Sequence, residues 1–190
     1  MPIKMDRRKK YTQMVLKESF LKLLNEKQLS SITVKELCQL ADINRSTFYS
    51  HYADQYDLLS KMEEEIIEDM NKYLSECNFT KEDESEQVTE KLMEYIVKNK
   101  KVCQTLLCGN GDASFLEKVM LVAKENIKKN GFLGNHFNED TADYWSTFIV
   151  SGGIYVIKNW LERGMDKTPR EMALMINAFA SSGMNMLKFH

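Results

Sequence analysis

The residues best suited to chemistry stand together in one short segment, residues 45–52, which reads RSTFYSHY. An arginine can donate two hydrogen bonds to the O6 and N7 atoms of guanine, and hydroxyl groups donate well to phosphate oxygens. Arg45 is the first of these residues, and the N-terminal end of a helix in the major groove comes closest to the base edges. The segment therefore indicates contact with DNA.

A helical projection of the same segment separates an apolar face from a small polar face. At about 100° per residue, Phe48 and Tyr52 fall on one side, where they can pack on preceding helices. Ser46 and Ser50 point roughly the opposite way, with Thr47 near them. A small polar face can enter a major groove about 12 Å wide, whereas a bulkier face would be obstructed.

Three predicted helix starts surround this segment. Thr33 is the expected N-cap of the first helix, and Glu36, three residues later, is placed to complete a capping box. Asn44 opens the second helix and Asp54 the third. Only a few residues around Asp42 join the first two helices, which is typical of a helix-turn-helix. The alternative is a three-helix surface bundle whose polar face only meets water.

Residues 7–60 resemble the DNA-binding domain of the TetR/AcrR family of bacterial transcriptional regulators. That family has an opening amphipathic helix, an ITVxE(I/L) helix and an (S/N)RxTFYxH(F/Y) recognition helix, which correspond to residues 11–25, 32–41 and 44–52. The resemblance implies a three-helix, helix-turn-helix domain over residues 1–54 that binds duplex DNA. The side chains expected at DNA are Thr33, Lys35, Asn44, Arg45, Ser46, Thr47, Tyr49, Ser50 and His51.

Two positions depart from the pattern of that family. Asp42 stands where the turn usually has a glycine, and an aspartate adopts the left-handed conformation only at some cost. Gln55 stands where a lysine commonly opens the fourth helix and contacts a phosphate. Loss of one phosphate contact is expected to lower the affinity for DNA and to flatten its salt dependence slightly.

Charge is divided unevenly along the 190 residues. Residues 1–61 hold 11 Lys/Arg against 7 Asp/Glu, and the remainder holds 15 against 21. A basic first part is expected where DNA binding is confined to one end. The sequence shows no apolar run of about 18 residues and no signal peptide, and its four cysteines lack CxxC spacing. We therefore expect a cytoplasmic protein with free thiols and no membrane contact.

Almost all of the remaining sequence predicts helix, because it has no sustained alternation of polar and apolar residues. Together with the three helices before them, the further helices give an all-α protein of about nine helices. Residues 55–190 are expected to form a C-terminal helical domain for ligand binding and dimerisation. The further helices are expected at about residues 55–77, 86–98, 102–107, 114–129, 141–163 and 169–188. The helix before Gly164 is expected to end there in a Schellman motif closed by Met165, and Thr168 is the expected N-cap of the last helix, with Pro169 in its first turn.

The last two predicted helices carry more apolar surface than one small domain can cover, so two copies are expected to associate as a four-helix bundle. Both could instead be ordinary core helices. Residues 152–172 resemble the C-terminal domain of a Firmicutes subgroup akin to regulators of dihydroxyacetone kinase genes. The resemblance implies a dimer interface on these helices. Its expected residues are Gly152, Gly153, Trp160, Met172, Ile176, Phe179, Ala180 and Gly183.

Two consecutive glycines, Gly152 and Gly153, stand inside one of these helices. Each costs roughly 1 kcal/mol relative to alanine in a helix interior. Close contact across the dimer would offset this cost, and so would a bend that opens a ligand cavity. The bundle favours close contact, and both interpretations remain open.

A ligand cavity in the second domain would be lined by aromatic, aliphatic and sulfur-containing side chains, which suit apolar ligands. The same side chains could form a plain core, since no cluster of convergent charged groups indicates a ligand chemistry. The candidates are Tyr95, Cys103, Leu107, Met120, Trp145, Phe148 and Tyr155.

Motifs of common catalytic sites do not occur: the sequence has no GxGxxG, P-loop, HExxH or GxSxG. We therefore predict no enzyme activity, no metal and no cofactor. The predicted function is a homodimeric transcriptional repressor that binds a palindromic operator and responds to a small-molecule effector. The competing hypothesis is a helical interaction protein, or an activator, that is controlled by a protein co-regulator.

Overall fold

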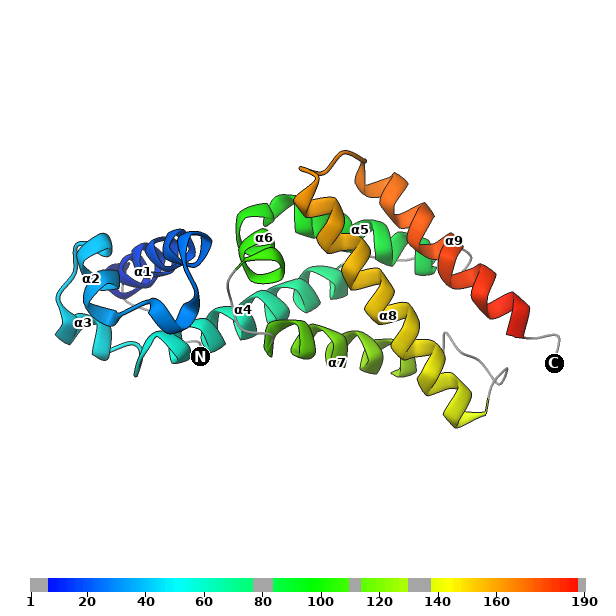
Figure 1. The fold of residues 1–190 in the computed structure, drawn as a ribbon, viewed down its shortest axis with the longest axis horizontal. Coiled ribbons are helices and arrows are strands. Elements are labelled where there is room, and N and C mark those ends of the chain that lie inside the picture. Colours follow the sequence, from blue (N-terminus) through cyan, green and yellow to red (C-terminus); the bar gives the residue numbers. More distant parts are fainter. Residues whose placement is uncertain (1–6, 77–83, 110–113, 130–137, 188–190) are drawn as a thin grey trace. The chain divides into compact units, whose positions relative to one another are not determined.

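The computed structural model describes residues 7–76, 84–109, 114–129 and 138–187, and these residues form helices and connecting turns without a β-strand. The all-α prediction is confirmed. Figure 1 shows the order of the elements. They are α1 (Arg7–Glu26), a 3-10 helix (Leu29–Ser31), α2 (Val34–Ala41), α3 (Arg45–Tyr49), α4 (Gln55–Ser75), α5 (Glu84–Lys98), α6 (Lys100–Cys108), α7 (Ser114–Lys129), α8 (Glu139–Glu162) and α9 (Pro169–Leu187).

Each predicted helix corresponds to one of these helices, and the differences lie at individual helix ends. The opening helix starts at Arg7 rather than at about residue 11. The recognition helix is shorter than expected, because regular α-helix ends at Tyr49 and residues 50–52 continue as a turn. The short 3-10 helix before α2 was not predicted.

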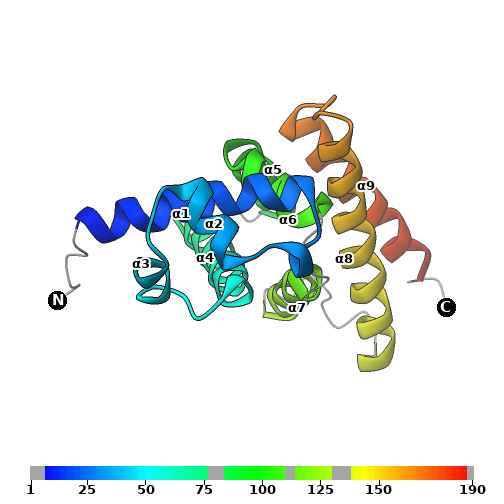
Figure 2. The same cartoon turned by 60° about the vertical axis from the view of Figure 1, so that its left-hand side comes forward.

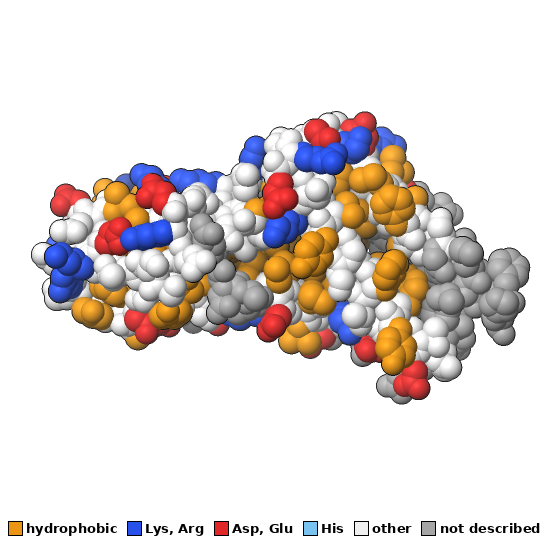
Figure 3. Space-filling view, in the orientation of Figure 1, with side chains coloured by type: hydrophobic (Ala, Val, Ile, Leu, Met, Phe, Trp, Pro, Cys, Tyr) orange, Lys and Arg blue, Asp and Glu red, His pale blue; other side chains and the backbone are white. Residues whose placement is uncertain are grey.

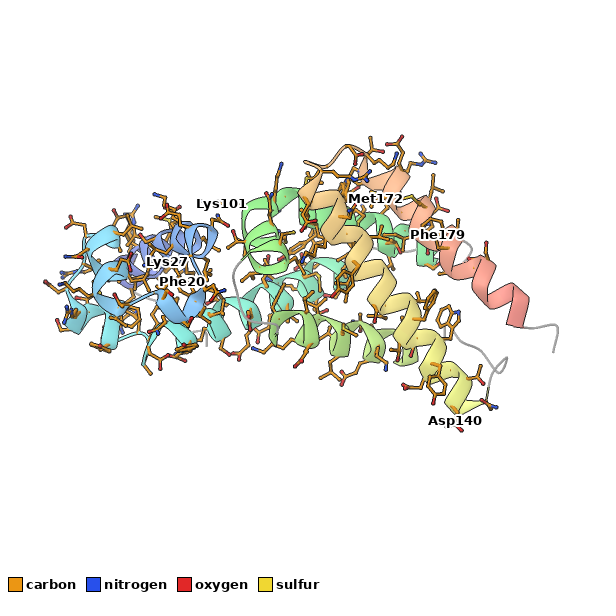
Figure 4. The ribbon with its side chains drawn as sticks, in the orientation of Figure 1. Phe20, Lys27, Lys101, Asp140, Met172 and Phe179 are labelled. Carbon is orange, nitrogen blue, oxygen red and sulfur yellow. The ribbon has the colours of Figure 1, made fainter. Side chains whose placement is uncertain are left out.

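The chain divides into two compact units, residues up to Glu68 and most of the residues from Asp69 onward. The division falls inside α4. In the first unit, buried apolar side chains converge from four helices, among them Phe20 of α1, Leu37 of α2, Phe48 of α3 and Leu58 of α4. Figure 4 labels Phe20 among the helices of this unit. The first four helices therefore share one small core.

The second unit is built from pairs of packed helices. Helix α9 packs along α5, and α8 packs on α6 and α7 (Figures 1 and 2). Side chains from α5, α6, α8 and α9 meet in a cluster that we call the Trp160 cluster. Its buried members are Met93, Ile96, Cys103, Ile157, Trp160, Leu161 and Met172.

The turn between α8 and α9 follows from local sequence signals. Gly164 has φ +80°, and the amide of Met165 donates to the carbonyl of Trp160 at 2.9 Å, which completes a Schellman motif. Thr168 and Glu171 then form a reciprocal capping box ahead of Pro169, with N–O distances of 2.7 and 3.2 Å. The predicted C-cap and N-cap are both confirmed.

Three of the four cysteines lie in the described residues, and all three are free thiols. Burial raises the pKa of Cys103 to about 12, so this thiol stays protonated at neutral pH. Cys77 lies outside the described residues. Within the described ranges, no helix is long and apolar enough to cross a membrane, and no three His, Cys, Asp or Glu side chains are grouped to hold a metal ion.

Candidate DNA-binding surface

Helix α2 begins as the sequence predicts, but only half of the expected capping box forms. The hydroxyl of Thr33 accepts a hydrogen bond from the amide of Glu36 at 3.3 Å. The Glu36 carboxylate does not return to Thr33. It pairs with Lys27, whose ammonium group lies 2.6 and 2.5 Å from its two oxygens. This ion pair joins the end of α1 to α2. Thr33 and Lys35, at the start of α2, are exposed.

The turn between α2 and α3 is tight and uses Asp42 in the left-handed conformation, with φ 53° and ψ 48°. The amide of Ile43 donates to the carbonyl of Cys38 at 3.0 Å, so the end of α2 is closed as a glycine would close it. The sequence prediction that Asp42 adopts this conformation is confirmed. The turn brings the start of α3 close to α2.

Helix α3 is anchored by two aromatic side chains. Phe48 is fully buried and Tyr52 nearly so, and their ring centroids are 5.7 Å apart. Tyr49 packs edge-on against Phe48, which holds its ring in place, yet the residue is 57% exposed. Arg45 and Ser46 are exposed at the start of the helix. The helix therefore has the apolar and polar faces predicted for it.

Asn44 opens α3 through its backbone alone, since its carbonyl accepts from the amide of Phe48 at 3.1 Å and its side chain makes no capping bond. The expected side-chain cap at this position is wrong. The amide side chain of Asn44 is exposed.

Ser50 is less suited to a phosphate than the sequence indicates. Its hydroxyl donates to the carbonyl of Thr47 at 2.7 Å, so the proton that a phosphate oxygen would accept is already engaged. Thr47 and His51 are half-buried. The exposed donors on this face are therefore mainly Arg45, Ser46 and Tyr49.

Helix α4 contacts the residues that directly follow α3 and holds them in place. Asp54 accepts from the amide of Asp57 at 2.8 Å as the N-cap, and Asp57 accepts from the amide of Ala53, the residue before the cap, at 2.9 Å. Lys61 joins Asp57 at 2.9 Å, lies over the ring of Tyr52 at 5.3 Å, and donates to the carbonyl of His51 at 3.2 Å. The predicted cap at Asp54 is confirmed, and Lys61 is a positioning residue that the sequence did not reveal.

The predicted interface residues of the second unit differ in their burial. Trp160 and Met172 are buried in the Trp160 cluster of their own chain, and their assignment to a surface is therefore wrong. Ile176 is half-buried against the same cluster, and Ala180 and Gly153 are half-buried too. Exposed positions remain at Gly152 and at Phe179, which lies farther along α9 than Met172 (Figure 4). Gly183 lies beyond the residues whose surroundings are described.

The predicted pocket residues are also divided. Phe148 and Tyr155 are 75% and 62% exposed on α8, so they cannot line an enclosed cavity of one chain. With Tyr144, which the sequence analysis did not select, they follow one face of the helix. Hydrophobic side chains are visible on this side of the second unit in Figure 3.

The remaining pocket candidates lie in different surroundings. Cys103 and Leu107 belong to the Trp160 cluster. Tyr95 is buried and donates to Asp69 at 3.0 Å, and its burial and then this bond raise its pKa. Met120 is half-buried on α7, and Trp145 is buried on α8. Of these candidates, Cys103 and Leu107 share one cluster, and Tyr95 is near enough to Cys103 for the thiol to raise its pKa as well.

Residues 83–182 match the family model TetR_C_8, which describes a transcriptional regulator C-terminal region. The chain is also 41% identical over 58 residues to YxbF of Bacillus subtilis (strain 168), an uncharacterized HTH-type transcriptional regulator. The match covers 30% of this chain and 15% of the length of that curated relative.

Solved structures share the fold over nearly the whole chain. A TetR transcriptional regulator from Streptococcus agalactiae 2603V has a TM-score of 0.72 and 24% identity, and the match covers 92% of this chain and 96% of that one. The dihydroxyacetone kinase operon activator DhaS has a TM-score of 0.59 and 17% identity over 92% and 97% of the two chains.

Proposed function

Because this chain belongs to the TetR family of transcriptional regulators, we propose that it is a ligand-responsive repressor that binds a palindromic operator as a homodimer. The observation that carries the proposal is the polar face of α3, where Arg45, Ser46 and Tyr49 are exposed on a helix fixed by buried Phe48. A regulator of this family binds DNA through such a helix. The effector site and the likeness to the dihydroxyacetone-kinase-regulator subgroup are parts of the proposal.

The residues on this face suit different parts of a DNA half-site. Arg45, at the first turn of α3, is placed for two hydrogen bonds to a guanine, and Lys35 is the second cation for base edges. Tyr49, Thr47 and His51 are placed for phosphates, which fix the position of the helix but carry little sequence information. Thr33, Asn44 and Ser46 add exposed polar groups at the two helix starts.

Dimerisation through α8 and α9 is supported by apolar side chains that the chain leaves in solvent. Tyr144, Phe148 and Tyr155 follow one face of α8, and Phe179 is 60% exposed on α9. A soluble protein rarely leaves a continuous row of large apolar side chains uncovered. A second copy related by a two-fold axis covers equivalent rows on both chains and places two recognition helices on one face of DNA.

The test begins with selection of bound fragments from genomic DNA of the source organism, followed by fluorescence anisotropy on the recovered operator. Replacing Arg45 by Ala should cost about 1–3 kcal/mol and relax the preference at one base pair of each half-site. Tyr49→Phe should weaken all sequences about equally, since it removes a phosphate donor. Lys22→Ala is the matched control, because Lys22 is exposed on α1, outside α2 and α3.

Two results would reject the proposal. If no fragment is enriched over a non-binding control protein, the chain acts through protein partners, as in the competing hypothesis. If Arg45→Ala changes neither affinity nor sequence preference, the assigned face of α3 does not read DNA. The sign of regulation needs a reporter driven by the recovered operator: removal of the protein should raise transcription, and a fall would identify an activator.

A further inference from the structure

Two side chains of α4 hold the short connection between α3 and α4 (Figure 1). Asp57 accepts a hydrogen bond from the amide of Ala53 at 2.9 Å. Lys61 donates a hydrogen bond to the carbonyl of His51 at 3.2 Å. The bonded carbonyl and the bonded amide belong to the two peptide groups on either side of Tyr52. The two α4 side chains therefore restrain the backbone on both sides of that residue.

The ammonium group of Lys61 is engaged within the first unit. Its Nζ lies 2.9 Å from a carboxylate oxygen of Asp57, one helical turn earlier, in addition to its bond with the carbonyl of His51. It also lies 5.3 Å from the centroid of the Tyr52 ring, which is within the range of a cation–π contact. An ammonium group has three N–H donors, and two of them are used by these oxygen atoms. The charge of Lys61 is thus matched by groups of the protein itself.

Helix α3 needs such support because it is too short to hold its own end. It consists of Arg45–Tyr49, and a helix of five residues is not stable alone. The amides of His51 and Tyr52 continue its last turn, since both donate to the carbonyl of Phe48, at 2.9 and 3.0 Å. Burial of the Tyr52 ring fixes the position of the ring but leaves the adjacent peptide groups free to rotate. Those peptide groups are the ones that the two α4 side chains bind.

His51 connects this support to the proposed DNA-binding surface. Its carbonyl accepts from Lys61, its amide closes the end of α3, and its ring centroid is 6.1 Å from that of Tyr52. Its side chain is also one of those proposed to bind phosphates. Without the bond to its carbonyl, the backbone of His51 is less restricted and the imidazole moves with it. A hydrogen bond to a phosphate weakens steeply when its distance or angle changes.

From these contacts we infer that the ion pair of Asp57 and Lys61 positions His51 for a phosphate of the DNA, and that Lys61 does not itself contact DNA. The inference rests on the proposed DNA binding, for which it identifies the residues that act through His51. The competing role for Lys61 is direct contact with a phosphate, because it is the only Lys or Arg of α4 before Lys72.

Operator affinity, measured by fluorescence anisotropy over a range of salt concentrations, separates positioning from direct contact. Lys61→Met keeps most of the apolar stem and removes the charge and the donors. It should lower operator affinity about tenfold, as expected for one hydrogen bond to a charged group, and leave the salt dependence unchanged. A slope of log affinity against log salt that is lower by about 1 would show that Lys61 contacts a phosphate. That result, or an unchanged affinity, would overturn the inference.

Lys72→Met is the matched control. Lys72 is exposed on the same helix and pairs with Glu76 at 3.9 Å, with the same i, i+4 spacing as the pair of Asp57 and Lys61. The change removes the same groups from another ion pair of α4, so operator affinity should stay within about twofold. A tenfold loss in this variant as well would assign the effect of Lys61→Met to the total charge of the protein and would contradict the assigned role.

A double-mutant cycle shows whether Lys61 acts through His51. In a protein that already carries His51→Ala, Lys61→Met should lower operator affinity less than about threefold, because the contact that it positions is absent. If Lys61 only stabilised the fold, the loss would be about the same in both proteins. Equal losses would therefore reject the inference.

Amide hydrogen exchange in the absence of DNA observes the restrained segment directly. In Lys61→Met, the amides of His51 and Tyr52 should exchange about tenfold faster, because the end of α3 opens more often. The amide of Leu37 in α2, which donates to the carbonyl of Thr33 at 3.0 Å, should keep its rate. Unchanged exchange at the end of α3, or equal acceleration at Leu37, would show that Lys61 does not restrain this segment specifically, and the inference would be wrong.

The proposed function and the role of Lys61 fail separately in these experiments. Absence of operator binding by the unchanged protein would reject the proposed function, and the exchange rates would still show whether Lys61 restrains the segment. Operator binding by the unchanged protein without any loss in Lys61→Met would reject only the role of Lys61.

Discussion

Replacement of Gly152 by alanine gives the sharpest test of the proposed dimer. Phe148, Gly152 and Tyr155 have i, i+4 and i+7 spacing, so the glycine stands in the middle of the exposed row on α8. A Cβ built on Gly152 meets no atom within 4 Å in the isolated chain. Among the described residues, nothing therefore explains why alanine, the better helix former, is absent.

The magnitude follows from two opposing effects. In the monomer, alanine should stabilise α8 by about 1 kcal/mol, because it lowers the conformational entropy that the helix removes on folding. In a dimer that brings two helices into close contact at Gly152, each added methyl group should cost about 1–3 kcal/mol of packing strain. Two-fold symmetry places this site twice in the interface, so the dimer should weaken at least about 30-fold.

Gly153→Ala is the matched control. Gly153 is half-buried on a neighbouring face of α8, and its added Cβ would also meet no atom within 4 Å in the chain. This variant should gain the same helix stability while the dimer constant stays nearly unchanged. Sedimentation equilibrium over a range of concentrations measures the dimer constant, and urea unfolding at the lowest concentration measures the stability of the monomer.

The outcome also decides between close contact and a bend at the two glycines. If Gly152→Ala dimerises as tightly as the unchanged protein, close packing at this position is wrong. A bend would instead be indicated by variants that remain dimeric, become more stable and no longer release DNA when the effector binds.

Three further changes in the first unit have defined outcomes. Asp42→Gly should raise the unfolding free energy by up to about 1 kcal/mol in urea titrations, because glycine adopts φ 53° without strain, and a decrease would mean that the carboxylate has a role in the fold. Ser50→Ala should leave operator affinity within about twofold, because the hydroxyl proton is engaged by Thr47, and a tenfold loss by anisotropy would contradict this. Hydrogen bonds from Lys61 and then from the amide of Ala53 lower the pKa of Asp57, so its contribution to stability should be present above the ordinary aspartate pKa and be lost as the pH falls through the lowered value. In Asp57→Asn, the acid side of the stability profile should be flatter, and an unchanged profile would assign acid sensitivity to other groups.

Features predicted correctly from the sequence depend on residues close together in the chain. The cap at Asp54, the Schellman turn at Gly164 and the cap at Thr168 each need residues no more than five positions apart. Such patterns fix helix ends before any tertiary contact forms. The helix bounds in both units were therefore largely predictable, apart from the shorter α3.

The errors arise where a side chain has two possible partners. Glu36 has a local partner at Thr33, but the ammonium group of Lys27, nine residues upstream, is the stronger one. Ser50 could meet a phosphate, yet the free carbonyl of Thr47 is already within reach at the end of a short helix. A residue list identifies groups able to bind, whereas the folded backbone determines which of them remain available.

Helix α8 shows the same limit on a larger scale, and it also suggests how the proposed switch works. The sequence identifies α8 as unusually apolar without showing which aromatic residues face inward. The structure places Trp160 in the core, Phe148 and Tyr155 in solvent, and Trp145 with a buried donor. The exposed row proposed as the dimer face and the buried aromatic residues of the second unit thus lie on one helix. In the proposed dimer, an effector that binds one geometry of the two chains better than another would shift the population between them. An effector with equal affinity for both geometries would bind without releasing DNA.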